Sequence, residues 1–263
     1  MIGFNVLGQL GRLGNQMFQL ASLRGIAANN GYNYALPPSR NKNEWVDHQL
    51  FIPFTLDGVN PLNVQFIEHD RPTVEEDTFY FNEKLFNDCP DWVTLQGYFQ
   101  SQKYFLNIED TIRSMFTFRP EVLDPCKSMI NSVEDPVSLH IRRGDYLTNH
   151  ANHNNLGLDY YVKGLDHFEG RNIIIFSDDP AWCKQQELFK DDNRFLVSEE
   201  NNQYTDMCLM SLCRSHIIAN SSFSWWGAWL SNSLDVVAPS KWFGPDKVHL
   251  DTKDLYCKGW AVI

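Results

Sequence analysis

The sequence is short of positive charge. Its 263 residues carry 22 Lys and Arg against 33 Asp and Glu, which gives a formal net charge of −11. A protein that binds nucleic acid through the phosphates needs a basic face, so this balance argues against a nucleic-acid partner. It does not exclude a local basic pocket for one small anion, because the charge of a site and the net charge are separate quantities.

The sequence also lacks a long apolar run and a paired-cysteine motif. No stretch reaches the roughly 18 apolar residues of a membrane-spanning helix, and residues 1–7 have no basic region ahead of an apolar core, as a signal peptide has. We therefore expect a cytoplasmic protein without a transmembrane anchor. The cysteines show neither a C-x-x-C pair nor zinc-finger spacing, so we expect six buried free thiols: Cys89, Cys126, Cys183, Cys208, Cys213 and Cys257.

What is present in the second half is a regular alternation of short apolar runs and helical patterns. Strands that alternate with helices of about ten residues indicate right-handed βαβ crossovers and a parallel sheet. Continuous apolar runs such as residues 173–176 suit strands that are buried on both faces. We expect strands at 137–141, 172–176, 195–197, 216–219 and 235–238, and helices at 158–168, 180–189, 205–213 and 222–230.

The first half opens in the same way and then becomes irregular. Residues 37–91 are rich in Pro, Asn and Asp and follow no clear pattern, and the stretch 118–134, which contains two prolines, is the candidate boundary. The fold class is therefore α/β with two lobes, an N-terminal lobe at 1–125 and a C-terminal lobe at 126–263. Within the first lobe we expect strands at 2–7 and 32–36, helices at 16–29 and 101–116, and a loop with Gly8, Gly11 and Gly14 after the first strand.

Polar side chains gather where three of the predicted strands end. They lie at 140–146, at 177–179 and at 220–226. In an open parallel sheet, ligands bind beyond the carboxyl ends of the strands. Three polar strand ends in one sheet therefore predict a ligand site at this edge.

Arg142 and Arg143 leave the first of these strands and point to opposite sides. We expect one of them to clamp a phosphate, because the planar guanidinium matches phosphate geometry and stays charged. The other would pair with Asp145 or another carboxylate and brace the loop. A purely structural network of arginines and aspartates is an equally strong alternative.

The other two strand ends open helices, and each has a functional and a structural interpretation. Ser221 or Ser222 suits an N-cap, and the free N–H groups of a helix N-terminus bind phosphate. Asp178 and Asp179, after Ser177, suit either a ribose or base contact or a simple helix cap. Three tryptophans follow in the last helix, and we favour core packing over a sugar platform for Trp225, Trp226 and Trp229.

Four segments taken together resemble the α-1,2-fucosyltransferase family, part of a wider superfamily of α-1,2-, α-1,6- and protein O-fucosyltransferases. They stand in the family's order and span residues 11–228, nearly the whole chain. The segments are GRLGNQM at 11–17, HIRRGDY at 140–146, FSDD at 176–179 and NSSFSWWGA at 220–228.

The resemblance implies a GT-B architecture, in which two Rossmann-like lobes with parallel sheets face a central cleft and the C-terminal lobe holds GDP-fucose. By similarity, Arg142 would bind the β-phosphate, His140 would lie near the nucleotide, and Asp178 or Asp179 would recognise guanine or ribose. Asn15, from the opposite lobe, would reach the donor near the fucose. The whole donor site implied is Gly14, Asn15, His140, Arg142, Arg143, Ser177, Asp178, Asp179, Asn220, Ser221, Ser222 and Phe223, with Arg142, Asp145 and Asn15 as catalytic residues.

The implied reaction is transfer of L-fucose from GDP-β-L-fucose to a glycan acceptor, with inversion and without a metal or other cofactor. Animal members carry an N-terminal membrane anchor, so this chain resembles a microbial or viral member, and peripheral membrane association stays open. The identity of the general base stays open. Asp145, His48, Glu68 and His69 are the candidates, and a reaction without a base is the remaining alternative. One alternative is a fucosyltransferase of the same superfamily with a protein acceptor. The other is a non-catalytic carbohydrate-binding protein that uses the eight tryptophans.

Overall fold

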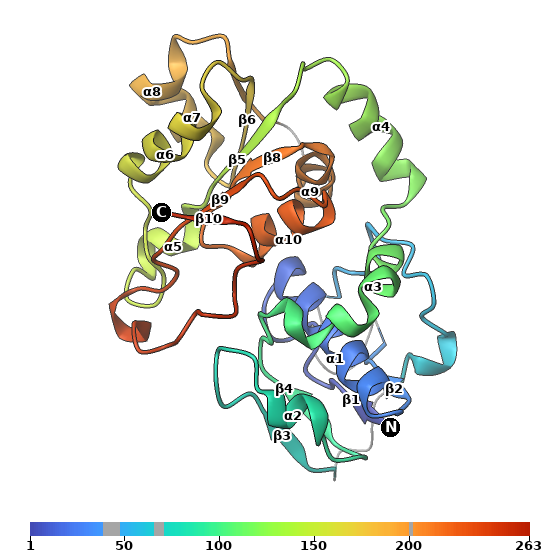
Figure 1. Cartoon of the computed structure of the whole chain (residues 1–263). Helices are drawn as coiled ribbons and strands as arrows, with labels where there is room; N and C mark the ends of the chain where they lie inside the picture. Colours follow the sequence, from blue (N-terminus) through green and yellow to red (C-terminus); the bar gives the residue numbers. More distant parts are fainter. Residues whose placement is uncertain (39–47, 66–70, 200–201) are drawn as a thin grey trace. The chain divides into compact units, whose positions relative to one another are not determined.

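The computed structural model describes residues 1–38, 48–65, 71–199 and 202–263. The chain divides into two compact units, and each is described by itself (Figure 1). Unit 1 comprises Met1–Arg119 and Asp251–Cys257, and unit 2 comprises Pro120–Leu250 and Lys258–Ile263. The division expected from the sequence, at 125/126, falls inside the helix Pro120–Ile130 (α4).

Unit 1 is built on a four-stranded parallel sheet with the order β2-β1-β4-β3. Its long helix α1 is almost entirely buried, from Leu13 to Ala27. The strands are β1 (Ile2–Gly3), β2 (Tyr34–Ala35), β3 (Thr73–Glu75) and β4 (Thr94–Gln96). The helices are α1 (Leu13–Asn29), α2 (Glu83–Asn87) and α3 (Glu109–Met115), with 3-10 turns η1 (Pro61–Asn63), η2 (Gln102–Tyr104) and η3 (Leu106–Ile108).

Three predictions for unit 1 need correction. The strand expected at 2–7 ends at Gly3, because the chain turns at once, with the N–H of Leu7 donating to the carbonyl of Phe4 at 2.9 Å. The helix expected from residue 16 begins at Leu13, whose N–H donates to Oε1 of Gln49 at 2.9 Å. The helix expected at 101–116 is confined to Glu109–Met115, since the φ angles of −140° at Phe105 and −133° at Ile108 depart from helical values and break the earlier turns.

Unit 2 is a doubly wound sheet of six parallel strands with the order β10-β9-β8-β5-β6-β7. From β5 the chain adds β6 and β7 on one side, and it then returns to add β8, β9 and β10 on the other. The sheet therefore has a topological switch point between β5 and β8. The strands are β5 (Val137–Ile141), β6 (Ile173–Ser177), β7 (Phe195–Val197), β8 (Ser215–Ile217), β9 (Val236–Ala238) and β10 (Ala261–Val262).

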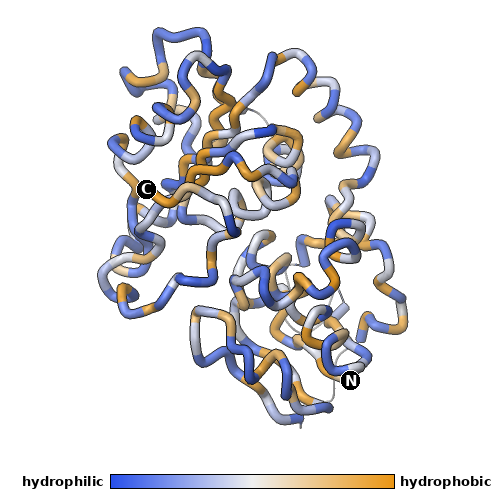
Figure 2. The backbone as a smooth tube through the Cα atoms, viewed as in Figure 1, coloured by the Kyte–Doolittle hydropathy of each residue, from blue (hydrophilic) through white to orange (hydrophobic). Residues whose placement is uncertain are grey.

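Helices cover both faces of this sheet (Figure 1). One face packs on α6 and α7 around a core that includes Leu139, Ile175, Tyr161 and Phe189. The central strands β5 and β6 are buried along nearly their whole length and are apolar in Figure 2, as their continuous hydrophobic runs predict. Besides α4, the helices are α5 (Gly144–Thr148), α6 (Leu158–Leu165), α7 (Pro180–Gln185), α8 (Glu187–Lys190), α9 (Gln203–Leu212) and α10 (Ser222–Leu230), with 3-10 turns η4 (Asp166–Phe168) and η5 (Pro245–Lys247).

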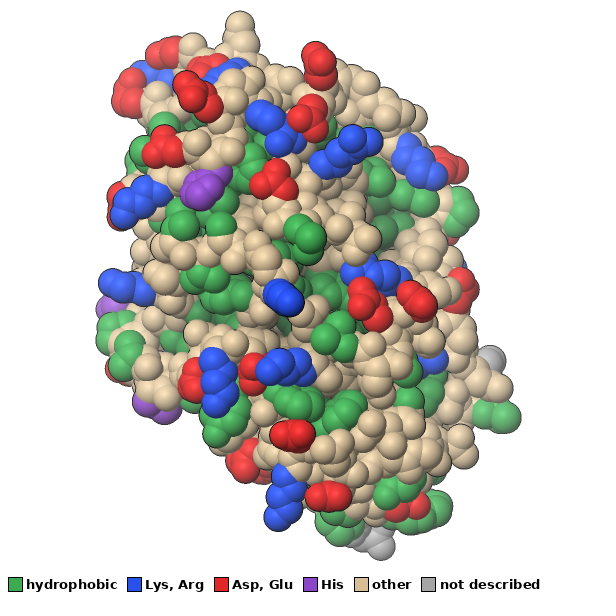
Figure 3. All heavy atoms as spheres, viewed as in Figure 1, with side chains coloured by type: hydrophobic (Ala, Val, Ile, Leu, Met, Phe, Trp, Pro, Cys, Tyr) green, Lys and Arg blue, Asp and Glu red, His purple; other side chains and the backbone are tan. Residues whose placement is uncertain are grey.

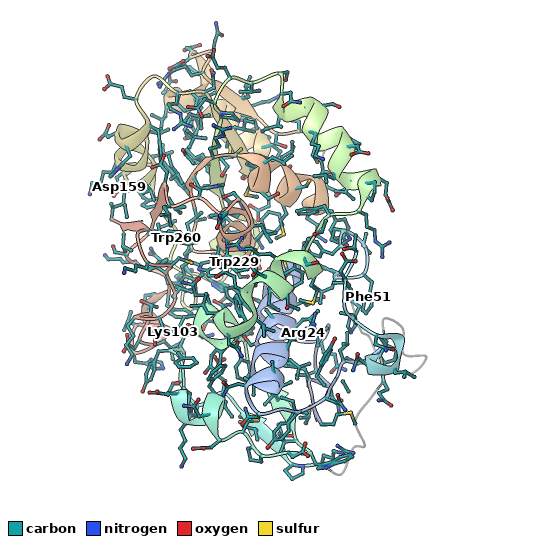
Figure 4. All side chains as sticks on the ribbon, turned by 45° about the vertical axis from the view of Figure 1, so that its right-hand side comes forward. Arg24, Phe51, Lys103, Asp159, Trp229 and Trp260 are labelled. Carbon is teal, nitrogen blue, oxygen red and sulfur yellow. The ribbon has the colours of Figure 1, made fainter. Side chains whose placement is uncertain are left out.

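The tryptophans of α10 belong to the core. Trp225 and Trp226 are fully buried, and Trp229 is 4% exposed. The Trp225 ring lies between those of Trp229 and Trp260, with centroids at 6.3 and 5.7 Å; the two outer residues are labelled in Figure 4. The prediction of core packing over a sugar platform is confirmed. All six cysteines are free thiols and five are buried, while Cys257 is half-buried.

The surface carries charges of both signs. Figure 3 shows basic and acidic side chains interspersed on the face in view, so neither sign dominates there. Within the part of the chain that the structure describes, no helix combines the length and the apolar character needed to span a bilayer.

Candidate active site

The switch point of unit 2 brings two of the predicted strand ends together. β5 and β8 are neighbours, with Leu139 opposite Ile217, and both run in the same direction. Their carboxyl ends therefore open at the same edge, where ligands of doubly wound folds bind. β6 lies on the other side of β5, so the third polar strand end joins the same edge.

Arg142, the first residue after β5, is held by two carboxylates. Its Nη2 lies 2.5 Å from Oδ1 of Asp145, and its Nη1 lies 2.7 Å from Oδ2 of Asp178. The side chain is 18% exposed, so it is largely shielded but reachable. A guanidinium offers five N–H donors, so the two ion pairs fix its orientation and leave donors for a ligand anion.

Arg143 is held differently and faces the neighbouring helix. Its Nε donates to Oδ2 of Asp179 at 3.1 Å, and its guanidinium stacks over the Trp182 ring at 3.8 Å. Its backbone N–H also donates to Oδ1 of Asp178 at 2.9 Å. These contacts match the bracing role expected for one of the two arginines, and the phosphate role of Arg142 stays a prediction.

Asp178 and Asp179 have different structural roles. Asp179 caps α7, because its Oδ1 accepts from the N–H of Trp182 at 3.1 Å while its own N–H donates to Ser177 Oγ at 3.0 Å. The capping alternative therefore holds for Asp179. Asp178 instead holds the loop after β5, because its Oδ1 accepts from the backbone N–H of Arg143. A Cβ atom on Gly144 would lie 2.4 Å from Oδ2 of Asp178. Only glycine at 144 lets the loop approach Asp178 this closely.

The loop after β8 leads into the N-terminus of α10. Ser221 is the N-cap, with its Oγ accepting from the N–H of Phe223 at 3.3 Å. Ser222 is the first residue of the helix, so the N-terminus of α10 lies at the carboxyl end of β8, next to the switch point. Asn220 fixes the loop that leads into α10, since its Nδ2 donates to the carbonyls of Asn154 and Trp242 at 2.8 Å each.

His140, the fourth residue of β5, is a buried imidazole beside this helix end. It is 4% exposed, and its ring centroid lies 5.6 Å from that of Phe223. Burial, with the charge of Arg142, lowers the pKa of His140 to about 3, so the ring is neutral at physiological pH. Its Nδ1 is buried without a hydrogen-bond partner among the described residues. A polar atom left in this way is unusual and marks a place where a ligand could bond.

Sequence reasoning missed several residues that complete the site. Tyr146 donates from its hydroxyl to the carbonyl of Asn220 at 3.0 Å, which links the loops after β5 and β8. The Tyr146 ring stacks on His153 with centroids at 4.0 Å and planes at 8°. Tyr146 stands within the HIRRGDY segment and could have been selected from it. No local pattern marks His153 or Trp182.

The remaining predicted residues belong to unit 1. Gly14 and Asn15 lie in the first turn of α1, and Oδ1 of Asn15 accepts from Nε2 of Gln100 at 2.8 Å. His48, a candidate base, is buried with its ring centroid 5.3 Å from that of Phe51, which is labelled in Figure 4. The other two candidates, Glu68 and His69, lie outside the described residues.

The described residues contain no cluster of side chains suited to hold a metal ion. In the ranges 1–38, 48–65, 71–199 and 202–263, no three His, Cys, Asp or Glu side chains are grouped as a metal site requires. The acidic residues at the switch point are instead engaged by Arg142 and Arg143.

One known protein family spans both units of the chain. Residues 2–263 match glycosyl transferase family 11. The chain belongs to this family. The resemblance to α-1,2-fucosyltransferases that the four segments indicate is therefore confirmed, since curated relatives carry that activity in their names.

Relatives within glycosyl transferase family 11 cover most of the chain. The α-1,2-colitosyltransferase of Escherichia coli is 32% identical over 96% of both chains. The O-antigen biosynthesis glycosyltransferase WbnK, also from Escherichia coli, is 40% identical over 62% of this chain and 59% of its own. The galactoside α-(1,2)-fucosyltransferase 1 of Bos taurus is 25% identical over 91% of this chain and 69% of its own.

Solved structures confirm the fold class. POFUT1 in complex with GDP superimposes with a TM-score of 0.53 at 12% identity, covering 88% of this chain and 94% of that one. The fucosyltransferase NodZ from Bradyrhizobium gives a TM-score of 0.52 at 15% identity, covering 82% and 89%. The family 11 chain is thus an α/β protein with two parallel sheets, like these GT-B glycosyltransferases.

Proposed function

We propose that the chain transfers L-fucose from GDP-β-L-fucose to the 2-hydroxyl of a galactoside, with inversion, to give an α-1,2-linked fucoside. The family and the names of its relatives support this activity. The observation that carries it is the position of Arg142 and the N-terminus of α10 at the same edge of the unit 2 sheet, after the neighbouring strands β5 and β8.

The difficult step of this reaction is the growth of negative charge on the departing GDP. In our proposal the guanidinium of Arg142 and the positive N-terminal end of the α10 dipole meet that charge. Fixed donors of this kind act in the transition state without reorganising, which makes them the largest catalytic contribution in many enzymes. Ion pairs with Asp178 and Asp145 hold the guanidinium in position.

The other donor contacts follow from the same placement. The neutral His140, Phe223 and the loop at Asn220 would face the nucleoside diphosphate, while Arg143, Ser177 and Asp179 support the loop and α7. Gly14 and Asn15 would contact the donor from unit 1. We also propose that transfer needs no divalent cation, because Arg142 and the helix end supply the positive charge.

A second donor sugar has specific support. The colitosyltransferase is 32% identical over 96% of both chains. Colitose lacks the 3-hydroxyl of L-fucose, so the two donors present the same GDP to unit 2 and differ only at the sugar. GDP-colitose is therefore the alternative donor.

Calorimetry in EDTA with GDP, GDP-fucose, UDP and ADP tests the nucleotide. We expect binding by the guanine nucleotides alone, whereas binding of free fucose without nucleotide would support a carbohydrate-binding protein. Transfer assays with GDP-fucose and GDP-colitose against a panel of galactosides, with linkage analysis of the product, then test donor and acceptor. A product that is not α-1,2-linked, or transfer only to a protein, would overturn the proposal.

The metal requirement is tested in the same assay. We expect equal transfer rates in EDTA and in Mg²⁺ or Mn²⁺, because no step in the proposal uses a cation. Loss of transfer in EDTA that either cation restores would show that the guanidinium and the helix end are not sufficient.

A further inference from the structure

A second built site lies in unit 1, at the carboxyl end of its parallel sheet. Glu76 follows β3, and its backbone N–H continues the ladder by donating to the carbonyl of Gln96 at 2.8 Å. Its carboxylate accepts from two N–H groups that follow β4: that of Tyr98 reaches Oε2 at 2.8 Å, and that of Phe99 reaches both oxygens at 3.0 Å. The carboxylate is thus fixed at the edge where parallel sheets bind ligands.

The turn around this carboxylate leaves no room for another side chain. Gly97 has φ of +152°, and a Cβ there would lie 2.4 Å from Cβ of Glu76 and 2.8 Å from its Oε2. The turn is also held from α1, since Nε2 of the fully buried Gln19 donates to the carbonyl of Gly97 at 3.0 Å. The chain therefore positions Glu76 with the rigidity typical of a functional carboxylate.

The surroundings of Glu76 favour a group that exchanges a proton near neutral pH. Burial raises the pKa of Glu76 to about 7, and the charge of Asp77 adds to this, although the N–H groups of Phe99 and Tyr98 act in the opposite direction. The titratable groups that interact with it are Asp77, Tyr98 and Tyr104. An efficient general base has its pKa near the working pH.

The next residue along the turn carries an unpaired acceptor. Gln100 is 7% exposed, and among the described residues its Oε1 is buried without a hydrogen-bond partner. Its Nε2 is already used, since it donates to Oδ1 of Asn15. A sugar has hydroxyl groups that can supply the donor that this oxygen lacks.

We propose that Glu76 binds the attacking hydroxyl of the acceptor and takes its proton during transfer. This inference rests on the proposed function, and every residue that carries it lies in unit 1. The acceptor oxygen forms its bond to C1 of the fucose, the bond from C1 to the β-phosphate oxygen breaks with its electron pair going to GDP, and the acceptor proton moves to a carboxylate oxygen of Glu76. Glu76 then releases the proton to solvent. Asp145, by contrast, is paired with Arg142.

Glu76→Gln is the decisive variant. Oε2 lies within 3.0 Å of both N–H groups, so the single carbonyl oxygen of glutamine can accept from both and keep the turn. Removing a general base costs roughly 10²–10⁴ in rate, so we expect kcat for transfer to fall by at least about 100-fold. The matched control is Glu75→Gln, because Glu75 is the exposed neighbour at the end of β3 and should leave kcat unchanged.

Four measurements separate proton transfer from a structural role. GDP affinity and the slow hydrolysis of GDP-fucose without acceptor should be unchanged in Glu76→Gln. The kcat/KM of the wild type should rise as the pH increases through about 7. The kcat/KM of the variant should not show this rise. Glu76→Asp should recover part of the rate. Near wild-type transfer by Glu76→Gln, or loss of GDP affinity together with transfer, would overturn the inference.

The wild-type protein reports separately on the proposed function. If it neither binds GDP nor transfers a sugar, the proposed function fails and the role of Glu76 fails with it. If it transfers and Glu76→Gln transfers equally well, only the role of Glu76 is wrong.

Discussion

At the scale of single residues, Arg142 combines two ion pairs with free donors. Lysine cannot copy this, because one ammonium group cannot bridge Asp145 and Asp178 and also present a fork to a diphosphate. We expect Arg142→Lys to lower kcat/KM for transfer by ~10²–10³, as the loss of one preorganised donor does in other enzymes. Steady-state kinetics with GDP-fucose measures this.

The control for this change is Arg194→Lys. Arg194 pairs with Asp192, two residues away, at 2.8 Å, and has no contact with the switch point among the described residues. Its replacement should leave kcat/KM as it is. Turnover close to wild type in Arg142→Lys would contradict the leaving-group role.

The sequence predicts some of these residues and not others, for a physical reason. Arg142 and Asp178 stand directly after apolar runs, so a rule about strand ends finds them. Glu76 has no such signal, because its N–H donors come from residues 98 and 99 and the segment before it follows no periodic pattern. Gly144 likewise gains its meaning only from the approach of Asp178.

At the scale of secondary-structure elements, β5 and β8 each carry a buried histidine on the same sheet. His216 lies between two hydroxyls, with Nδ1 2.7 Å from Ser138 Oγ and Nε2 2.8 Å from Ser231 Oγ. Burial lowers the pKa of both His140 and His216 to about 3. Both rings are therefore neutral in the folded protein at pH values where the unfolded chain protonates them.

The free energy of unfolding should therefore fall as the pH drops below about 6.5. Each histidine adds about 1.4 kcal/mol per pH unit to this slope until the pH approaches its folded pKa. Without His216, unfolding should take up one proton fewer between pH 6 and 4. His216→Gln should therefore make the pH dependence of the free energy of unfolding less steep, whatever it does to the absolute stability. Urea unfolding at several pH values measures this, and an unchanged slope would contradict the neutral state of His216.

The elements were predictable where the apolar pattern is regular. The strand at 137–141 and the helix at 222–230 match β5 and α10 residue for residue. The helix expected at 180–189 is broken at Gln186, whose ψ of 130° separates α7 from α8. The start of α1 depends on Gln49, 36 residues away from Leu13, so no local rule could place it.

At the scale of the whole molecule, the residues proposed to hold GDP in unit 2 come from two loops. Binding of GDP should slow amide hydrogen exchange in residues 142–148 and 221–225, because the ligand would engage the N–H groups and hold both loops. Helix α4, away from the switch point in sequence and largely exposed, should not change. Exchange measured by mass spectrometry, with UDP as the control nucleotide, tests this. Protection confined to unit 1 would contradict the assignment.

The short return of the chain to unit 1 limits how the protein can be divided. Asp254 accepts from the N–H of Phe81 at 3.2 Å and from Nζ of Lys103 at 2.6 Å, and Leu255 is buried. A fragment that stops at Arg119 would lose these partners, and a fragment that starts at Pro120 would carry them away. Exchanging a lobe with that of a relative, to build a hybrid transferase of new specificity, therefore requires a graft at 251–257 as well as a cut at the first junction.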